Sequence, residues 1–338
     1  MRCPKKFLCA IPVGLVIGLL IFMLAVRIQL GVPTASSAWV HDLIERKQIA
    51  AQSIKAPKLV LLGGSGTLFG LKASVLEAEL GIPVINGGLH AGLGMDCILR
   101  EGKKMLRPGD TVMLFPEYEL LSFGEKNRRE WAAITYLDYM LSRNSNHYLT
   151  LPLADQIEIA LMTPLDRIGK GIKSQWVKEN LSPESDYNPY DVVWLDDHGD
   201  MTGHHASRRP ALAEDRDQRI CEPFIKGISL EEEGFELISD FNKWAKANRV
   251  KVLAGFPSMV DRKEYDSNRT GNVEGTLRSF YFNQRINVVG CLRDSLLSRN
   301  EFYDTIYHPT VESSQRISMI LAKSFSQAFA SMPELNSF

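Results

Sequence analysis

Residues 58–66 read Lys-Leu-Val-Leu-Leu-Gly-Gly-Ser-Gly, and this stretch decides the fold that we predict. A continuous apolar run that stops at two glycines is typical of a strand buried on both faces of a parallel sheet. Further along the chain, helical patterns over 68–80 and 96–106 alternate with short apolar runs over 83–86 and 110–115. This alternation predicts an α/β domain with a mostly parallel sheet, whose functional residues lie at the carboxyl ends of the strands.

The same alternation returns toward the C-terminus. A helix, two strands and a closing amphipathic helix are predicted over 230–248, 250–257, 287–291 and 311–330. Residues from about 124 to 230 interrupt the pattern with polar and charged sequence, and we interpret them as an insertion or lid. The predicted domain therefore covers residues 57–330, and it follows a polar, helical connector over 31–56.

The N-terminus carries an apolar run from Phe7 to Val26, preceded by three basic residues and followed by Arg27. A run of about 20 apolar residues is long enough to span a bilayer as a helix. We interpret residues 1–30 as a cytoplasmic tip and an uncleaved transmembrane anchor. The alternative is a signal peptide cleaved near Ala35-Ser-Ser-Ala38, but signal peptides have a shorter apolar core. The positive-inside rule places the N-terminus in the cytoplasm and the domain outside it.

The charge balance disfavours nucleic acid as a partner, because 39 Lys and Arg residues face 40 Asp and Glu residues. The five cysteines lack CxxC spacing, so we expect free thiols rather than a disulfide framework. The segment Trp194–His205 is rich in histidines and carboxylates, but it matches no metal motif. It is better interpreted as a polar loop lining a cleft, and we predict no metal or other cofactor.

Ser65 lies in the glycine turn after the first predicted strand, where a helix begins. Backbone N–H groups at such a turn favour negative charge, which suits a nucleophile whose attack creates an oxyanion. A plain helix N-cap is the alternative, and the loop lacks both GK[ST] and GxGxxG for phosphate binding. Near the end of the chain, Asp304 and His308 lie in a loop before the last helix. An imidazole can take the serine proton and a carboxylate can orient the imidazole, although a lone loop histidine is more often a surface residue.

A second glycine-rich loop follows the strand over 83–86 and reads Asn86-Gly-Gly-Leu-His90-Ala91-Gly92. In a parallel sheet this loop lies beside the Ser65 turn, so its N–H groups are candidates to bind an oxyanion. A tight turn that needs small residues for packing explains the same glycines, and both explanations can hold together.

These motifs together resemble the SGNH (GDSL-like) hydrolase superfamily, and more closely its membrane-anchored branch of DltD- and AlgJ/AlgX-like proteins. The resemblance covers about 57–120 and 250–330. It implies a three-layer SGNH-like sandwich with Ser65 as nucleophile, His308 as general base and Asp304 as the residue that orients His308. It also implies an oxyanion hole formed by the backbone N–H groups of Ser65 and of Ala91 or Gly92.

Three features depart from the family pattern. Ala91 falls where the family usually has a glycine, so the oxyanion donor of this loop is either Ala91 or Gly92. Asp304 and His308 are separated by three residues where the family has two. The family also has an asparagine after the third strand, where this sequence reads Leu114-Phe-Pro-Glu-Tyr118. Tyr118 is therefore a candidate replacement donor, and Tyr118 and His90 are candidate residues of the substrate cleft.

The resemblance implies an extracytoplasmic serine O-acyltransferase or esterase that acts on acyl esters of a cell-envelope or exported polysaccharide, with acetyl as the expected acyl group. It further implies a glycan substrate, an inner-membrane location with the domain in the periplasm, and an MBOAT-type membrane protein as acyl donor. A plain esterase shares every catalytic residue and stays open as an alternative. A non-catalytic assembly or glycan-binding subunit is the third hypothesis. The missing asparagine after the third strand and the longer spacing between Asp304 and His308 favour it.

Overall fold

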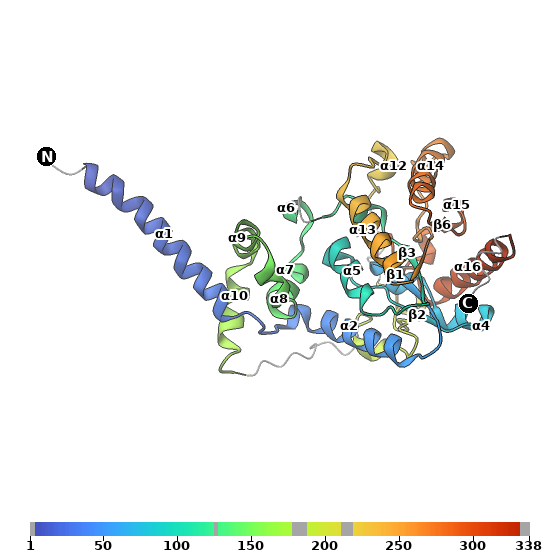
Figure 1. Cartoon of the computed structure of the whole chain (residues 1–338), viewed down its shortest axis with the longest axis horizontal. Coiled ribbons are helices and arrows are strands. Elements are labelled where there is room, and N and C mark those ends of the chain that lie inside the picture. Colours follow the sequence, from blue (N-terminus) through green and yellow to red (C-terminus); the bar gives the residue numbers. More distant parts are fainter. Residues whose placement is uncertain (1–3, 125–127, 178–187, 211–218, 332–338) are drawn as a thin grey trace. The chain divides into compact units, whose positions relative to one another are not determined.

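The computed structural model describes residues 4–124, 128–177, 188–210 and 219–331 (Figure 1). The chain forms two compact units. The anchor unit comprises Met1–His41 and Ala132–Glu184, and the sheet unit comprises Asp42–Trp131 and Ser185–Phe338. Helix α2 (Ala35–Ser53) contributes residues to both. Of the insertion predicted over about 124–230, residues 132–184 belong to the anchor unit and the rest belongs to the sheet unit. Two stretches of that insertion, 178–187 and 211–218, lie outside the described residues.

The sheet unit is built on the predicted parallel sheet. Its five strands are β1 (Leu59–Gly63), β2 (Val84–Asn86), β3 (Thr111–Phe115), β4 (Lys251–Ala254) and β6 (Asn287–Val288). They lie in the order β2-β1-β3-β4-β6, and every neighbouring pair is parallel. All residues of β1 and β3 are buried, as the unbroken apolar runs predict. Two shorter strands, β5 (Met259–Val260) and β7 (Leu296–Leu297), form a separate parallel pair.

Helices of the sheet unit pack against the sheet and against one another (Figure 1). Helix α4 (Ala73–Leu80) packs on α16 (Val311–Ser331), and α5 (Gly94–Lys103) packs on α13 (Glu233–Ala247). Helix α14 (Ser267–Asn283) packs on β6. The shorter helices are α3 (Ser65–Gly70), α6 (Arg128–Trp131), α12 (Pro223–Lys226), α15 (Leu292–Ser295), η1 (Ala91–Leu93), η2 (Tyr118–Leu121), η4 (Val192–Trp194), η5 (Ala206–Arg208) and η6 (Arg299–Glu301).

The single helix predicted over 68–80 is in fact two helices, α3 and α4. Leu71 between them has extended backbone angles, φ −124° and ψ 149°. The break is stabilised by Asp200, whose carboxylate accepts the N–H groups of Ala73 at 2.7 Å and Ser74 at 3.0 Å. A carboxylate at a helix start satisfies donors that have no partner within the helix. Asp200 lies far away in sequence, so a local pattern could not have revealed the break.

The anchor unit contains α1 (Pro4–Ile28) and four short helices, α7 (Ile134–Ser142), α8 (Ser145–Thr150), α9 (Leu153–Met162) and α10 (Leu165–Lys173). Residues Ala10–Ile28 of α1 are apolar and long enough to cross a membrane, which fits an anchor or a signal sequence. Arg167 is buried and bonds to Asp138, to the side chain of Gln29 and to the carbonyl of Val32. Thr34 Oγ1 also donates to Asp138, at 2.7 Å. Residues just after the apolar helix are therefore part of a buried polar network.

Candidate active site

Ser65 is the first residue of α3 and comes two residues after the end of β1. The glycines beside it are there because other atoms come very close. A Cβ on Gly63 would lie 2.4 Å from the Phe115 carbonyl oxygen, and a Cβ on Gly64 would lie 2.5 Å from the Glu117 carboxylate. A Cβ on Gly66 would lie 3.2 Å from the same carboxylate. Ser65 is thus the residue of this turn that has room for a side chain.

Glu117 is the residue that fills the space beneath the turn. Its side chain is buried and accepts the N–H of Gly64 at 3.0 Å and the N–H of Gly66 at 2.6 Å. Burial raises the pKa of this carboxyl to about 7, although the two N–H groups oppose the rise. The N–H of Ser65 lies between the two that Glu117 binds, and no described residue accepts it.

The sequence prediction singled out Tyr118, the neighbour of Glu117, as a donor and cleft residue. In the structure Tyr118 is buried, and its ring packs edge-on against Phe224 with centroids 4.9 Å apart. The residue after β3 that binds the Ser65 turn is Glu117. The sequence carries only a general signal, since an acidic residue two positions after a buried strand needs hydrogen-bond donors, and the sequence does not show which donors these are.

Asp304 and His308 are paired despite the extra residue between them. Asp304 Oδ1 lies 2.8 Å from His308 Nδ1, and His308 is buried. The turn is closed by the Tyr303 N–H, which donates to the His308 carbonyl at 2.7 Å. Burial alone would raise the pKa of the Asp304 carboxyl, but hydrogen bonds from His308 and Tyr190 hold this pKa below its usual value. An ionised Asp304 fixes the proton of His308 on Nδ1 and leaves Nε2 to act as a base.

Tyr190 is a third member of this group, and the sequence prediction missed it. Its hydroxyl donates to Asp304 Oδ2 and lies 3.3 Å from His308 Nδ1. Burial and the charge of Asp304 raise the pKa of the phenol, so it stays protonated and donates. No local motif marks Tyr190, because it lies more than a hundred residues before Asp304.

Helix α3 lies next to this group. The ring of Phe69 is 4.6 Å from the His308 ring and 5.1 Å from the Tyr190 ring. Phe69 follows Ser65 by four residues, so the two side chains share one face of α3. Within the described residues, no hydrogen bond joins Ser65 Oγ to His308. The structure therefore brings Asp304, His308 and Tyr190 into contact and places them beside the helix that begins with Ser65.

The second glycine-rich loop lies beside the Ser65 turn, as the sheet order requires. The Leu89 N–H donates to the Gly63 carbonyl at 3.0 Å. The loop is tied to α3 by Asn86, whose amide nitrogen donates to the carbonyls of Thr67, Leu68 and Leu71 and whose Oδ1 accepts the Gly88 N–H.

Of the two oxyanion donors expected in this loop, Gly92 already has a partner. Its N–H donates to His90 Nδ1 at 3.1 Å. Ala91 begins η1, and none of the described residues accepts its N–H. Burial and the nearby His308 lower the pKa of His90 to about 4, so His90 is neutral and carries its proton on Nε2. The structure leaves Ala91 and Ser65 as the two candidate backbone donors.

The histidines and carboxylates of 194–205 have separate partners. Asp200 caps α4, His198 Nε2 lies 3.6 Å from Glu77, and His205 Nδ1 lies 3.1 Å from Glu312. His204 is buried with Nε2 3.1 Å from the Phe69 carbonyl. This segment therefore supports α3, α4 and α16 from the side.

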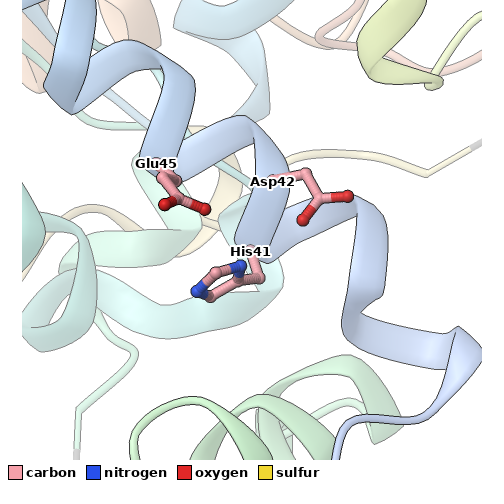
Figure 2. Close-up of side chains that lie close together, drawn as sticks. All are labelled: His41, Asp42 and Glu45. Atoms are coloured by element: carbon pink, nitrogen blue, oxygen red, sulfur yellow. The ribbon is translucent and has the colours of Figure 1, made fainter.

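A group of metal-binding residue types occurs on α2, where His41, Asp42 and Glu45 have ligand atoms within 4.8 Å of one another (Figure 2). Asp42 and Glu45 are exposed. Exposed acidic groups commonly approach one another without an ion, so this group is assigned no role in binding a metal.

Comparison with known proteins adds no family to these observations: no family model matches the chain, and no curated protein matches it.

Proposed function

We propose that this protein is a membrane-anchored serine O-acyltransferase or esterase with Ser65 as nucleophile. The observation that carries the proposal is the Asp304–His308 pair, 2.8 Å apart and in ring contact with the helix that Ser65 begins. Hydrogen bonds of catalytic groups are often long or absent without substrate, so a rotation of the Ser65 side chain toward His308 belongs to the proposal.

In the proposed reaction, His308 Nε2 takes the Ser65 hydroxyl proton as Oγ attacks the acyl carbonyl. The N–H groups of Ser65 and Ala91 stabilise the oxyanion. Collapse of the tetrahedral intermediate breaks the ester bond, and His308 returns the proton to the leaving alcohol. An acceptor hydroxyl then attacks the acyl-serine while His308 takes its proton; the bond between Ser65 Oγ and the acyl group breaks, and His308 returns the proton to Ser65. The acceptor is a glycan in a transferase and water in an esterase. Asp304 and Tyr190 hold His308 in the required tautomer throughout.

The proposal includes the architecture of the sheet unit, which we propose is a three-layer SGNH-like sandwich. The chain moves from β1 to β2 in one direction along the sheet and from β2 to β3 in the other. Right-handed crossovers then place α4 and α5 on opposite faces. The strand order therefore supports helices on both sides of the sheet.

The location in the proposal is the inner membrane, with the N-terminus in the cytoplasm and the sheet unit in the periplasm. The basic residues before the apolar helix support this orientation. Two further parts of the proposal come from the SGNH resemblance alone: a polysaccharide substrate whose expected acyl group is acetyl, and an MBOAT-type donor protein.

The test is labelling of the full chain in detergent with a fluorophosphonate, which reacts with activated serines. We expect Ser65→Ala to abolish labelling and Ser53→Ala, an exposed serine at the end of α2, to leave it unchanged. Labelling that survives in Ser65→Ala would remove Ser65 as the nucleophile. Product analysis with and without a glycan acceptor then separates a transferase from an esterase.

A non-catalytic, glycan-binding subunit is the second candidate. The observation in its favour is the missing hydrogen bond between Ser65 Oγ and His308 within the described residues. Absence of labelling in the unsubstituted, folded chain would favour this candidate.

A further inference from the structure

The anchor unit exposes an unusual number of large apolar side chains. They are Leu153 at 65% exposed, Leu161 at 61%, Leu165 at 75% and Trp176 at 76%, joined by Leu149 at 44% and Val177 at 54%. Single exposed apolar residues are normal on a soluble protein, but a concentration in one small unit indicates a surface that is covered.

On α9 two exposed leucines, Leu153 and Leu161, and the half-buried Ile157 form a stripe. Leu153, Ile157 and Leu161 recur every four residues, so they lie along one face of the helix. The buried residues Gln156, Ile159 and Ala160 face the rest of the anchor unit. Helix α9 is thus apolar on a face that the unit does not bury, which a helix in water avoids.

The position of α9 and α10 relative to α1 indicates what covers this surface. Both helices pack on α1 within the anchor unit (Figure 1). The contacts lie at the end of the apolar span: Val26 and Gln29 are fully buried, and Gln175 Nε2 donates to the Ile28 carbonyl at 2.7 Å. The earlier part of the span is almost entirely exposed.

The length of the apolar span then sets the depth in the membrane at which α9 and α10 lie. The 19 residues Ala10–Ile28 extend about 28 Å at 1.5 Å per residue. The hydrocarbon core of a bilayer is about 30 Å thick. If α1 spans the bilayer, Val26 and Ile28 lie at its boundary, and the helices packed on them lie there too.

We propose that α9, α10 and the following Trp176 form a membrane-embedded surface whose exposed apolar side chains enter the lipid headgroup and acyl-chain boundary. The composition fits this location. Trp176 supplies the amphipathic ring typical of the interface, and the exposed Lys170 and Lys173 on α10 suit anionic headgroups. The anchor unit is then fixed to the bilayer by α1 and by this second surface together.

The inference rests on α1 as a membrane span and not on the chemistry proposed for Ser65. The test uses the full chain in phosphatidylcholine vesicles whose acyl chains carry bromine near the headgroup, because bromine quenches tryptophan on contact. The emission of Trp176 is obtained as the difference in tryptophan emission between the unsubstituted chain and Trp176→Phe. The matched control is Trp244→Phe, which reports Trp244 on α13 of the sheet unit.

We expect brominated lipid to remove about half or more of the Trp176 emission, because interfacial helices insert about 5–10 Å into this boundary. The Trp244 component should be unchanged. A second reporter, Leu161→Trp in the Trp176→Phe background, tests the α9 stripe in the same way. The proposal is overturned if neither reporter is quenched more than Trp244. Because these vesicles contain no protein other than this chain, that result would point to a protein partner covering the surface.

Discussion

Glu117 places a carboxylate directly beneath the turn that carries Ser65, where it binds the N–H groups on either side of the serine. Because these two donors are occupied, the Ser65 N–H is the donor between them that stays available for the oxyanion of the proposed reaction. The same contact explains why Gly64 and Gly66 carry no side chain. One buried acid thus accounts for the composition of the turn and for the donor that it presents.

Burial of Glu117 has a cost that depends on pH. Its pKa is about 7 in the folded chain and 4.5 as a reference, so between these values the folded state binds the extra proton. The contribution of Glu117 to the free energy of unfolding is therefore most favourable below pH 4.5 and falls as pH rises to about 7. At 1.36 kcal/mol per unit, the fall amounts to roughly 3 kcal/mol in the free energy of unfolding.

Glu117→Gln should remove this pH dependence, because the amide stays neutral. We expect the stability of the unsubstituted chain relative to Glu117→Gln to be lower at pH 8 than at pH 5, measured by denaturant unfolding of the full chain in detergent. The matched control is Glu77→Gln, since Glu77 also accepts a backbone N–H, that of Val84 at 2.9 Å. An equal difference at both pH values would contradict the role of Glu117.

Tyr190 contributes to the proposed active site through Asp304, the partner of His308. Tyr190→Phe keeps the ring against Phe69 but removes the hydroxyl that donates to Asp304. A hydrogen bond to a charged group is worth about 1.5–3 kcal/mol, so we expect fluorophosphonate labelling of Ser65 to slow by roughly tenfold or more. Tyr148→Phe, which removes a buried hydroxyl bonded to the Gln156 carbonyl, should not change the rate. Equal rates in the two variants would exclude Tyr190 from the proposed active site.

At the scale of helices and strands, the sequence predicted the elements that are determined by residues close together in the chain. The apolar runs located β1 to β4, and the order of strands and helices gave the parallel sheet. Helix α14 was missed, because its 17 residues include two glycines and no strong apolar stripe. Its one local signal is Asp266, whose side chain accepts the N–H groups of Asn268 and Arg269 at the helix start. The split of α3 from α4 depends on the distant Asp200 and leaves no local signal at all.

In the candidate site too, the sequence predicted the features that depend on residues close together in the chain. Ser65, Asp304 and His308 were predictable, because each occurs in a short motif at the end of a strand or before a helix. Tyr190 and Glu117 were not assigned, since their roles depend on partners that the fold brings from 114 and about 50 residues away. The occupied N–H of Gly92 could not be predicted either, because it depends on the rotamer of His90.

At the scale of the whole molecule, the chain has a unit that carries the proposed chemistry and a unit that carries the apolar helix. The insertion predicted over about 124–230 is divided between the two units. Its residues 132–184 group with the N-terminal 41 residues. The buried network of Arg167, Asp138, Gln29 and Thr34 is the physical reason, because none of these polar groups could be buried without the others.

That network makes a prediction about processing. Cleavage near Ala38 would remove Gln29, Val32 and Thr34, and each buried partner left unsatisfied would cost about 1–3 kcal/mol. Ala38 itself is buried within α2, where a peptidase has little access. We therefore expect the intact mass of the protein from membranes to include residues 1–38, and the protein to resist extraction by alkaline carbonate while detergent releases it. A soluble product that begins after Ala38 would show instead that the apolar helix is a signal peptide, and it would remove the membrane span on which the interfacial surface of α9 and α10 depends.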